Sequence, residues 1–252
     1  MMAFDVFRRH KDTSPPAWVR AAAAGVAAWE WLDDELREQL VTDTADLVVR
    51  FRWEAANGFN LTDEMRGLIA AHAALLTLGL GADWYRRVSS VIVHPTAFER
   101  SGEYDLGGGI VSDGVVDLLG ESDPHGPVVI AWTAARHDAA FPEGGRNVVL
   151  HEFAHQLDMA DGWVDGTPPL HDARARARWI DVCTRELERL RSGDDTDGLI
   201  DHYAANDPGE FFAVLSELFF TLPFDLAAEV PDLYDVLADF YLLDPASMVE
   251  AT

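Results

Sequence analysis

The stretch that decides the fold runs from residue 147 to residue 158 and reads Asn147-Val148-Val149-Leu150-His151-Glu152-Phe153-Ala154-His155-Gln156-Leu157-Asp158. Its apolar residues recur at helical spacing, which predicts a buried helix. His151 and His155 are four residues apart, so both imidazoles lie one turn apart on the same helix face. Two histidines in this arrangement can reach one zinc ion at the roughly 2.0–2.1 Å of a zinc–nitrogen bond. The stretch therefore predicts a metal site carried by a helix.

The residue that follows the first histidine is a carboxylate, Glu152. From this position it can reach a water held in the open coordination position of the metal and take its proton. A His-Glu-x-x-His string also arises by chance. Here Val148, Leu150 and Phe153 surround it with apolar side chains. That setting favours a metal site over an exposed helix face with two solvated histidines.

A catalytic zinc site needs a third protein ligand, and the local candidate is Asp161, six residues after His155. Zincins that take their third ligand at this position use a glycine three residues after the second histidine to turn the chain. Asp158 occupies that position here, although Gly162 comes close by. The turn toward Asp161 is therefore less favoured.

Two distant candidates for the third ligand lie on a helix that we predict from Pro208 to Thr221, with Asp207 before its first turn. Glu210 and Glu217 are seven residues apart and so share nearly one face of this helix. A carboxylate on an otherwise apolar helix is costly to bury unless it is paired or bound to a metal. Spacing alone leaves the choice between these two glutamates open.

Two stretches resemble the Mlc titration factor A (MtfA) family of zinc peptidases. One is the stretch 147–158, and the other begins at Tyr203 and reads Tyr-Ala-Ala-Asn-Asp-Pro-Gly-Glu-Phe-Phe-Ala-Val-Leu-Ser-Glu. The catalytic core of this family is similar to the protease domain of anthrax lethal factor, and both groups pair a His-Glu-Phe-x-His helix with a later Tyr-x(6)-Glu-Phe-Phe-Ala element. The resemblance follows the order of elements from about residue 60 to residue 240, and reaches the first sixty residues only as helical character.

Carried over position by position, the resemblance implies that His151, His155 and Glu210 bind one zinc ion. It implies that Glu152 is the general base and later the proton donor. It also implies that Tyr203 points its hydroxyl at the developing oxyanion, where a phenol donor reinforces a Lewis acid.

The resemblance does not identify which acidic residue orients the metal-binding histidines. Gluzincins of the thermolysin kind place an acidic residue four positions after the glutamate ligand to orient a histidine, and Val214 stands there in this chain. Glu217 is the obvious substitute, and Asp158 is a second candidate for orienting a ligand histidine. A buried structural hydrogen bond is the alternative role for Glu217.

Outside these motifs the chain predicts an α+β protein, mainly α, with a zincin-like core, a small β-sheet and an N-terminal helical part. Helical periodicity covers Trp18–Val26, Asp33–Trp53, Thr62 to Gly79 and most of the chain after Asn147. Strand character is concentrated at Val88–His94, Ile110–Val111, Val115–Val116 and Val128–Trp132. We expect residues 1–60 to form a helical extension packed on a catalytic domain of residues 61–252, so that the two form one compact unit.

The β region predicts a place for the substrate. A strand edge beside the metal lets an extended peptide add as a further strand, with its scissile carbonyl over the ion. We expect Val128–Ala131 to be that edge.

Charge and composition limit the partners. Forty-four acidic residues against nineteen basic ones give a formal charge of −25, which repels nucleic acid and anionic membrane surfaces. This acidity reflects either solubility and genome composition or a salt-adapted host. No apolar run approaches the roughly 18–20 residues that span a bilayer, and the N-terminus does not read as a secretory signal. Cys183 is the only cysteine, so no intramolecular disulfide forms, and a cytoplasmic location is the default.

Two functions from different classes follow. The first is zinc-dependent hydrolysis of amide bonds in short peptides, and the resemblance implies an aminopeptidase-like activity. The second is a binding role, because the founder of the family sequesters Mlc, a transcriptional repressor of sugar uptake. A degenerate peptidase is expected to lack the base or the oxyanion donor. This chain retains both Glu152 and Tyr203, which favours the enzyme.

Overall fold

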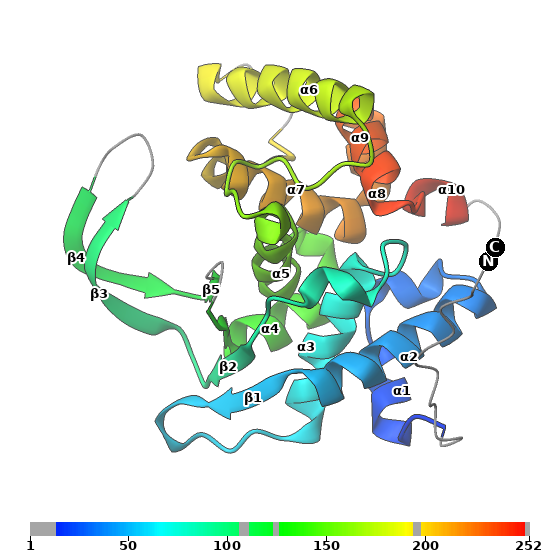
Figure 1. The fold of residues 1–252 in the computed structure, drawn as a ribbon, viewed down its shortest axis with the longest axis vertical. Helices are drawn as coiled ribbons and strands as arrows, with labels where there is room; N and C mark the ends of the chain where they lie inside the picture. Colours follow the sequence, from blue (N-terminus) through cyan, green and yellow to red (C-terminus); the bar gives the residue numbers. More distant parts are fainter. Residues whose placement is uncertain (1–13, 106–110, 123–125, 194–197, 250–252) are drawn as a thin grey trace, which may run out of the picture.

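The computed structural model describes residues 14–105, 111–122, 126–193 and 198–249 (Figure 1). Helices dominate it, in the order α1 (Ala17–Ala23), α2 (Asp34–Arg50), α3 (Asp63–Leu76), α4 (Trp132–Ala140), α5 (Val148–Asp158), α6 (Ala173–Ser192), α7 (Pro208–Thr221), α8 (Pro223–Glu229), α9 (Pro231–Tyr241) and α10 (Pro245–Val249). With the small sheet described next, this confirms the predicted α+β class with mainly α content.

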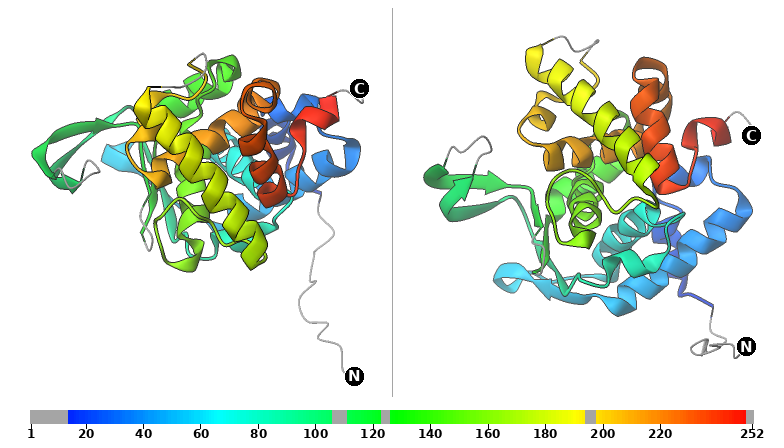
Figure 2. Two further views of the ribbon diagram at one scale, coloured as in Figure 1. Left: turned by 90° about the horizontal axis from the view of Figure 1, so that it is seen from above. Right: turned by 45° about the horizontal axis from the view of Figure 1, so that its top comes forward.

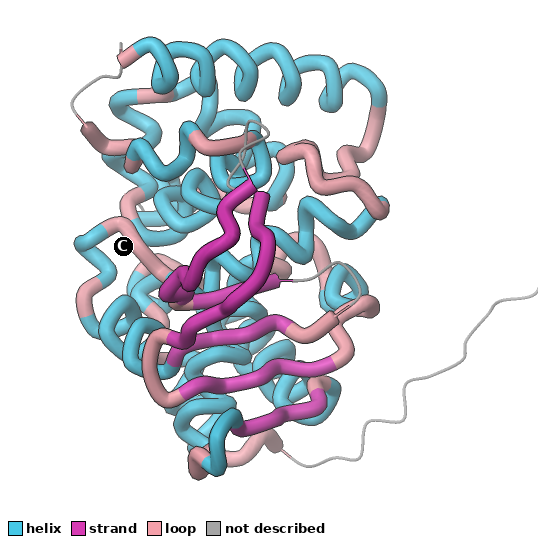
Figure 3. The backbone as a smooth tube through the Cα atoms, turned by 90° about the vertical axis from the view of Figure 1, so that its left-hand side faces the viewer, coloured by secondary structure: helices cyan, strands magenta, loops and turns pink. Residues whose placement is uncertain are grey.

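A four-stranded mixed sheet lies on one side of the helices (Figure 3). Its order is β1 (Arg52–Ala55), β2 (Ser90–His94), β6 (Val128–Ala131) and β5 (Gly120–Ser122). The strands β1, β2 and β6 run parallel to one another, whereas β5 runs antiparallel to β6. Within the described chain, β5 therefore forms one edge of this sheet and β1 the other.

A second sheet consists of β3 (Phe98–Asp105) and β4 (Val111–Leu118), which pair antiparallel. In Figures 1 and 2 this pair extends away from the body of helices. β4 ends two residues before β5 begins, so the chain passes from the extended pair directly into the edge strand of the main sheet.

The predicted helix Asp33–Trp53 is too long at its C-terminal end. The helix α2 ends at Arg50, and Phe51 is already extended, with φ −74° and ψ 138°. Trp53 belongs to β1, where it pairs with Val91 of β2. Helical periodicity could not show this, because the partner strand lies far along the chain. The first sixty residues thus contribute a strand to the sheet, and the predicted division at residue 60 stays a prediction.

Helix α5 lies at the centre of the fold, between the sheet and α7. The Phe153 ring is fully buried on the side away from the two histidines. Its centroid lies 5.7 Å from that of Phe51 and 5.1 Å from that of Tyr85. These rings join α5 to the end of α2 and to the turn Ala82–Tyr85. Further out, α6 lies beside α9 (Figure 2), and Arg178 pairs with Asp235 and Asp239 across that contact.

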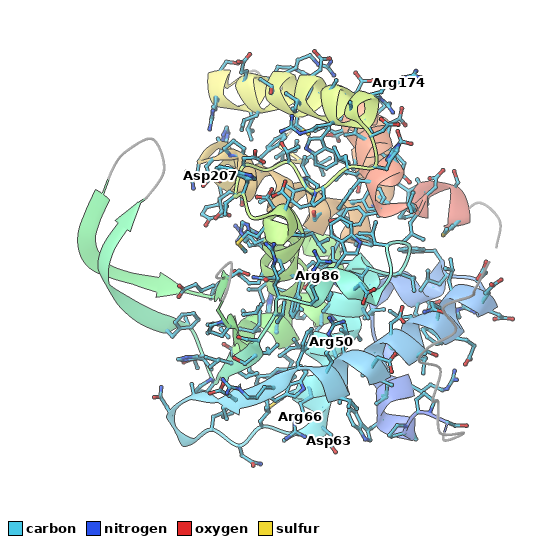
Figure 4. All side chains as sticks on the ribbon, in the orientation of Figure 1. Arg50, Asp63, Arg66, Arg86, Arg174 and Asp207 are labelled. Carbon is cyan, nitrogen blue, oxygen red and sulfur yellow. The ribbon has the colours of Figure 1, made fainter. Side chains whose placement is uncertain are left out.

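Local hydrogen bonds fix where α5 and α7 begin. The Asn147 Oδ1 atom accepts from the backbone N–H groups of Val149 and Leu150, both at 3.1 Å. Asp207, labelled in Figure 4, accepts at Oδ1 from the Glu210 N–H at 3.0 Å, and Pro208 follows it. Such caps satisfy N–H groups that have no partner within the helix. The start of α7 is therefore set by the sequence around Pro208, as predicted.

Among the described residues, no single helix has the length and apolar composition to cross a membrane. The pair Pro208–Thr221 and Pro223–Glu229 passes that test together by length and composition only, and it is bent by 116°.

Replacing Phe153 by Ala should destabilise the fold by about 3–5 kcal/mol, because it opens a cavity among buried rings. Urea unfolding followed by circular dichroism measures the change. Val49→Ala is the matched control, since Val49 is 86% exposed and such a change stays within about 0.5 kcal/mol. Equal unfolding midpoints for the two variants would contradict the central position of the Phe153 ring.

Candidate metal centre

Three side chains converge between α5 and α7. One ligand atom from each of His151, His155 and Glu210 lies within 4.8 Å of the other two, and no other group of this kind occurs among the described residues. The His151 Nε2 atom is 3.2 Å from His155 Nε2 and 3.0 Å from Glu210 Oε2. His155 Nε2 is 3.7 Å from Glu210 Oε1.

These separations fit a tetrahedral metal ion. Bonds of about 2.0–2.1 Å in that geometry place neighbouring donor atoms roughly 3.3–3.4 Å apart. The measured 3.0, 3.2 and 3.7 Å lie around this value. Two histidines with one glutamate are also a donor set of catalytic zinc sites, which leave the fourth position for water or substrate. The cluster can therefore hold a metal.

The charges within the cluster are coupled. Burial lowers the pKa of His151, but its hydrogen bonds to Glu210 and Glu217 raise that pKa well above the ordinary 6.5. Burial raises the pKa of Glu210, yet the hydrogen bonds from His151 and His155 lower it far below its ordinary value. Glu210 therefore stays ionised and offers a charged oxygen to a cation.

Glu217 supports the first histidine from behind. Its Oε1 atom lies 2.8 Å from His151 Nδ1, and its Oε2 atom accepts from the Asn147 N–H at 2.5 Å. One buried carboxylate thus orients the His151 ring and also ties down the start of α5. Both roles considered for Glu217 from the sequence are present in the structure. Its interaction with His151 provides the support that Val214 does not.

The two aspartates near the second histidine lie outside the cluster. Asp161 Oδ1 accepts from the Trp163 N–H at 2.9 Å and so belongs to a turn. Asp158 is fully buried, and its Oδ2 accepts from the Gly166 N–H at 3.0 Å. Burial raises the pKa of Asp158 to about 6, against the lowering effect of that hydrogen bond. In the described structure Asp158 fastens the chain after α5, and no hydrogen bond to His155 is seen.

The Glu152 side chain lies against Gly120 of β5 and is 6% exposed. Burial raises the pKa of Glu152, while the neighbouring imidazoles of His151 and His155 lower it. The Glu152 carboxylate therefore lies next to the cluster of His151, His155 and Glu210 but is not one of its converging donors.

Tyr203 lies in the short turn His202–Ala205, which contacts α7. Its ring centroid is 6.1 Å from that of His151, and the residue is 48% exposed. Partial burial and then the charges of Glu210 and Glu152 raise the pKa of Tyr203 above its ordinary value. The phenol is therefore a protonated donor at neutral pH, at the solvent side of the cluster.

The prediction that Val128–Ala131 is the free strand edge beside the metal site is wrong. Val128–Ala131 is β6, which has β2 on one side and β5 on the other, so it has no free edge. The edge strand is β5, which packs directly against α5, with Gln156 Nε2 donating to Ser122 Oγ at 2.5 Å. Sequence reasoning missed β5 because it has only three residues. The full burial of all four residues in β6 is the pattern of a central strand.

The comparison with known proteins adds a family. A family model described as glucose-regulated metallo-peptidase M90 matches residues 5–242. An uncharacterized protein of Synechocystis, slr2042, is 34% identical over 234 residues, which cover 92% of this chain and 85% of the relative. A protein named Mlc titration factor A from Serratia proteamaculans is 33% identical over 224 residues, or 87% of this chain and 84% of the relative. One of the same name from Edwardsiella ictaluri is 32% identical over 244 residues, or 92% of each chain.

Glu210→Ala should abolish stoichiometric metal binding, because it removes one of three converging donors. Asp161→Ala is the matched control and should leave the metal content unchanged, since Asp161 caps a turn. Zinc per chain, measured by mass spectrometry after dialysis, checks both. The opposite pattern would move the third ligand to Asp161.

Metal affinity should fall as the pH is lowered. A metal binds neutral imidazole, so a proton on His151 competes with it. Because the pKa of His151 is raised, this competition extends up into the neutral range, and the apparent affinity should drop about tenfold per pH unit below that pKa. Chelator competition between pH 8 and pH 6 measures the slope. A flat profile would contradict a metal bound through His151.

Proposed function

The chain belongs to the glucose-regulated metallo-peptidase M90 family, and from this premise we propose that it is a zinc-dependent peptidase. The proposed reaction is hydrolysis of amide bonds in short peptides, in an aminopeptidase-like manner and in the cytoplasm. The observation that carries the proposal is the convergence of His151, His155 and Glu210, with Glu152 beside them.

We assign the metal to His151, His155 and Glu210, because their separations fit tetrahedral coordination. Two nitrogens and one carboxylate oxygen suit zinc, which takes such ligands in catalytic sites. When bound, zinc supplies a Lewis acid and makes water a nucleophile at neutral pH. Glu217 holds His151 with Nε2 turned toward the site, through the bond to Nδ1.

Glu152 is the proposed general base. Its carboxylate accepts a proton from the attacking water and then donates it to the leaving nitrogen. Burial raises the pKa of Glu152, which brings it nearer to neutral pH, where a group can both accept and release a proton. The apolar residues around α5 keep bulk water away from this carboxylate.

Tyr203 is the proposed donor to the developing oxyanion. Its phenol is protonated at neutral pH, because the pKa of Tyr203 is raised. Since its ring centroid lies 6.1 Å from that of His151, its hydroxyl can donate to an oxygen near the cluster on which negative charge grows. Tyr203 and Glu152 then serve different atoms of the same reaction.

The edge strand β5 gives the substrate a place. One side of β5 is paired with β6, and its other edge has no partner strand in the described sheet. An extended peptide can add there through backbone hydrogen bonds, beside α5 and its glutamate. Backbone pairing accepts many side chains, which suits a peptidase for short and varied peptides.

A second candidate function is a regulatory binding role. Relatives of this chain are named Mlc titration factor A, and this name favours a contact with a repressor of the Mlc kind. In this reading the metal centre stabilises the fold, and any peptidase activity is accessory. The presence of Glu152 and Tyr203 beside the cluster supports the enzymatic function first.

Glu152→Gln should keep the metal and lose nearly all peptidase activity, because the amide has the same size but cannot accept the proton. The measurement is cleavage of amino-acid p-nitroanilides with free and with acetylated N-termini, beside zinc content. Preference for the free amine would support the aminopeptidase-like reading. A Glu152→Gln variant as fast as the wild type would exclude the proposed reaction.

Tyr203→Phe, measured in the same assay, tests whether Tyr203 acts through its hydroxyl or only through its ring. Loss of an oxyanion donor costs about 10²–10³ in kcat, whereas loss of an aromatic contact alone leaves kcat near the wild type because Phe keeps the ring.

A further inference from the structure

Gly120, the first residue of the edge strand β5, lies directly against the Glu152 side chain. A methyl group built on Gly120 would stand 2.5 Å from Glu152 Cγ and 2.7 Å from Glu152 Cδ, and closer still to its Oε1. The optimal separation of non-bonded carbon atoms is about 3.5–4.0 Å, and Cβ contacts under 3.0 Å are essentially never seen in proteins. Glu152 therefore occupies the space that any side chain at residue 120 would take.

The backbone does not require a glycine at this position. Gly120 is absent from the glycines with positive φ, and it pairs regularly with Ile130 of β6. Glycine in a strand loses stability because it has no side chain to pack and more freedom to lose, and it often marks a close approach. Here the close approach is to the carboxylate of Glu152.

A second contact between α5 and β5 lies one helical turn after Glu152. Gln156, one turn after Glu152, donates from Nε2 to Ser122 Oγ at 2.5 Å. Four helical residues rise about 6 Å, and two strand residues rise about 6.6 Å. The pairs Glu152–Gly120 and Gln156–Ser122 are therefore in step, with α5 and β5 running in the same direction. The hydrogen bond holds the strand at a distance where only glycine leaves room for the base.

We propose that Gly120 is a positioning residue that sets the place of the Glu152 carboxylate between the edge strand and the metal cluster. This inference rests on the proposed function, because it assigns Glu152 as the base. Gly120 acts only through Glu152 and supplies no reacting group. Side chains leave a strand perpendicular to the sheet, so a methyl group at residue 120 points at Glu152 and leaves the backbone edge of β5 free for substrate.

The test is Gly120→Ala beside Gly144→Ala. Gly144 is the matched control, because a methyl group there would meet no atom within 4 Å. In the Gly120→Ala variant we expect zinc content and KM to stay near the wild type while kcat falls about 10²-fold, as for a reacting group displaced by about 1 Å. Gly144→Ala should leave all three unchanged. A kcat of Gly120→Ala equal to that of the wild type would overturn the proposal.

Crystal structures of the zinc-loaded wild type and of Gly120→Ala test the displacement of Glu152 without an activity measurement. We expect the Glu152 carboxylate to leave its wild-type position while His151, His155 and Glu210 keep theirs. If Glu152 stays and β5 moves away from α5 instead, the proposal is wrong. An inactive wild type would defeat the proposed function alone, since the displacement of Glu152 is still measured.

Discussion

The arrangement of the metal centre depends on the Glu217 carboxylate, buried where α7 packs on α5. At 6% exposure it is stable only with partners. It finds them in the Nδ1 atom of His151 and the N–H of Asn147. The same pair of bonds fixes where α5 begins and how the His151 ring is turned. Because Nδ1 faces Glu217, Nε2 faces Glu210, and the cluster forms from that orientation.

Local sequence was sufficient for the helices that carry the site. The predicted bounds of α7, Pro208 to Thr221, are those of the structure, because Asp207 and Pro208 set its start through contacts within a few residues. Spacing could not separate Glu210 from Glu217, since both face α5. The difference lies in how α7 is placed along α5: Glu210, in its first turn, reaches Nε2, and the deeper Glu217 reaches Nδ1. The resemblance to a family selected Glu210 as the proposed third ligand. The packing of α7 on α5 explains why Glu210, and not Glu217, lies near Nε2.

The sheet could be predicted only in part. Val128–Ala131 is apolar at every position, and that pattern identified a strand but was mistaken for an edge. One neighbour of this strand, β2, is remote in the sequence, and the other, β5, is very short. No local sequence pattern therefore predicts that β6 is paired on both sides. Trp53 shows the same limit, because it continues a helical period yet pairs with Val91. Strand order depends on contacts between distant residues, and these decide which strand lies at the edge of the sheet.

The three proposed metal donors are unevenly distributed along the chain, so in the proposed site binding of the ion depends on the fold. His151 and His155 are neighbours on one helix, whereas Glu210 comes 59 residues after His151. An unfolded chain therefore offers the ion two donors, and only the docked α5 and α7 offer three. An ion that prefers the native state stabilises it by about 2.7 kcal/mol at a free concentration one hundred times its Kd. For the proposed site, the free energy of unfolding should therefore rise with the concentration of free metal.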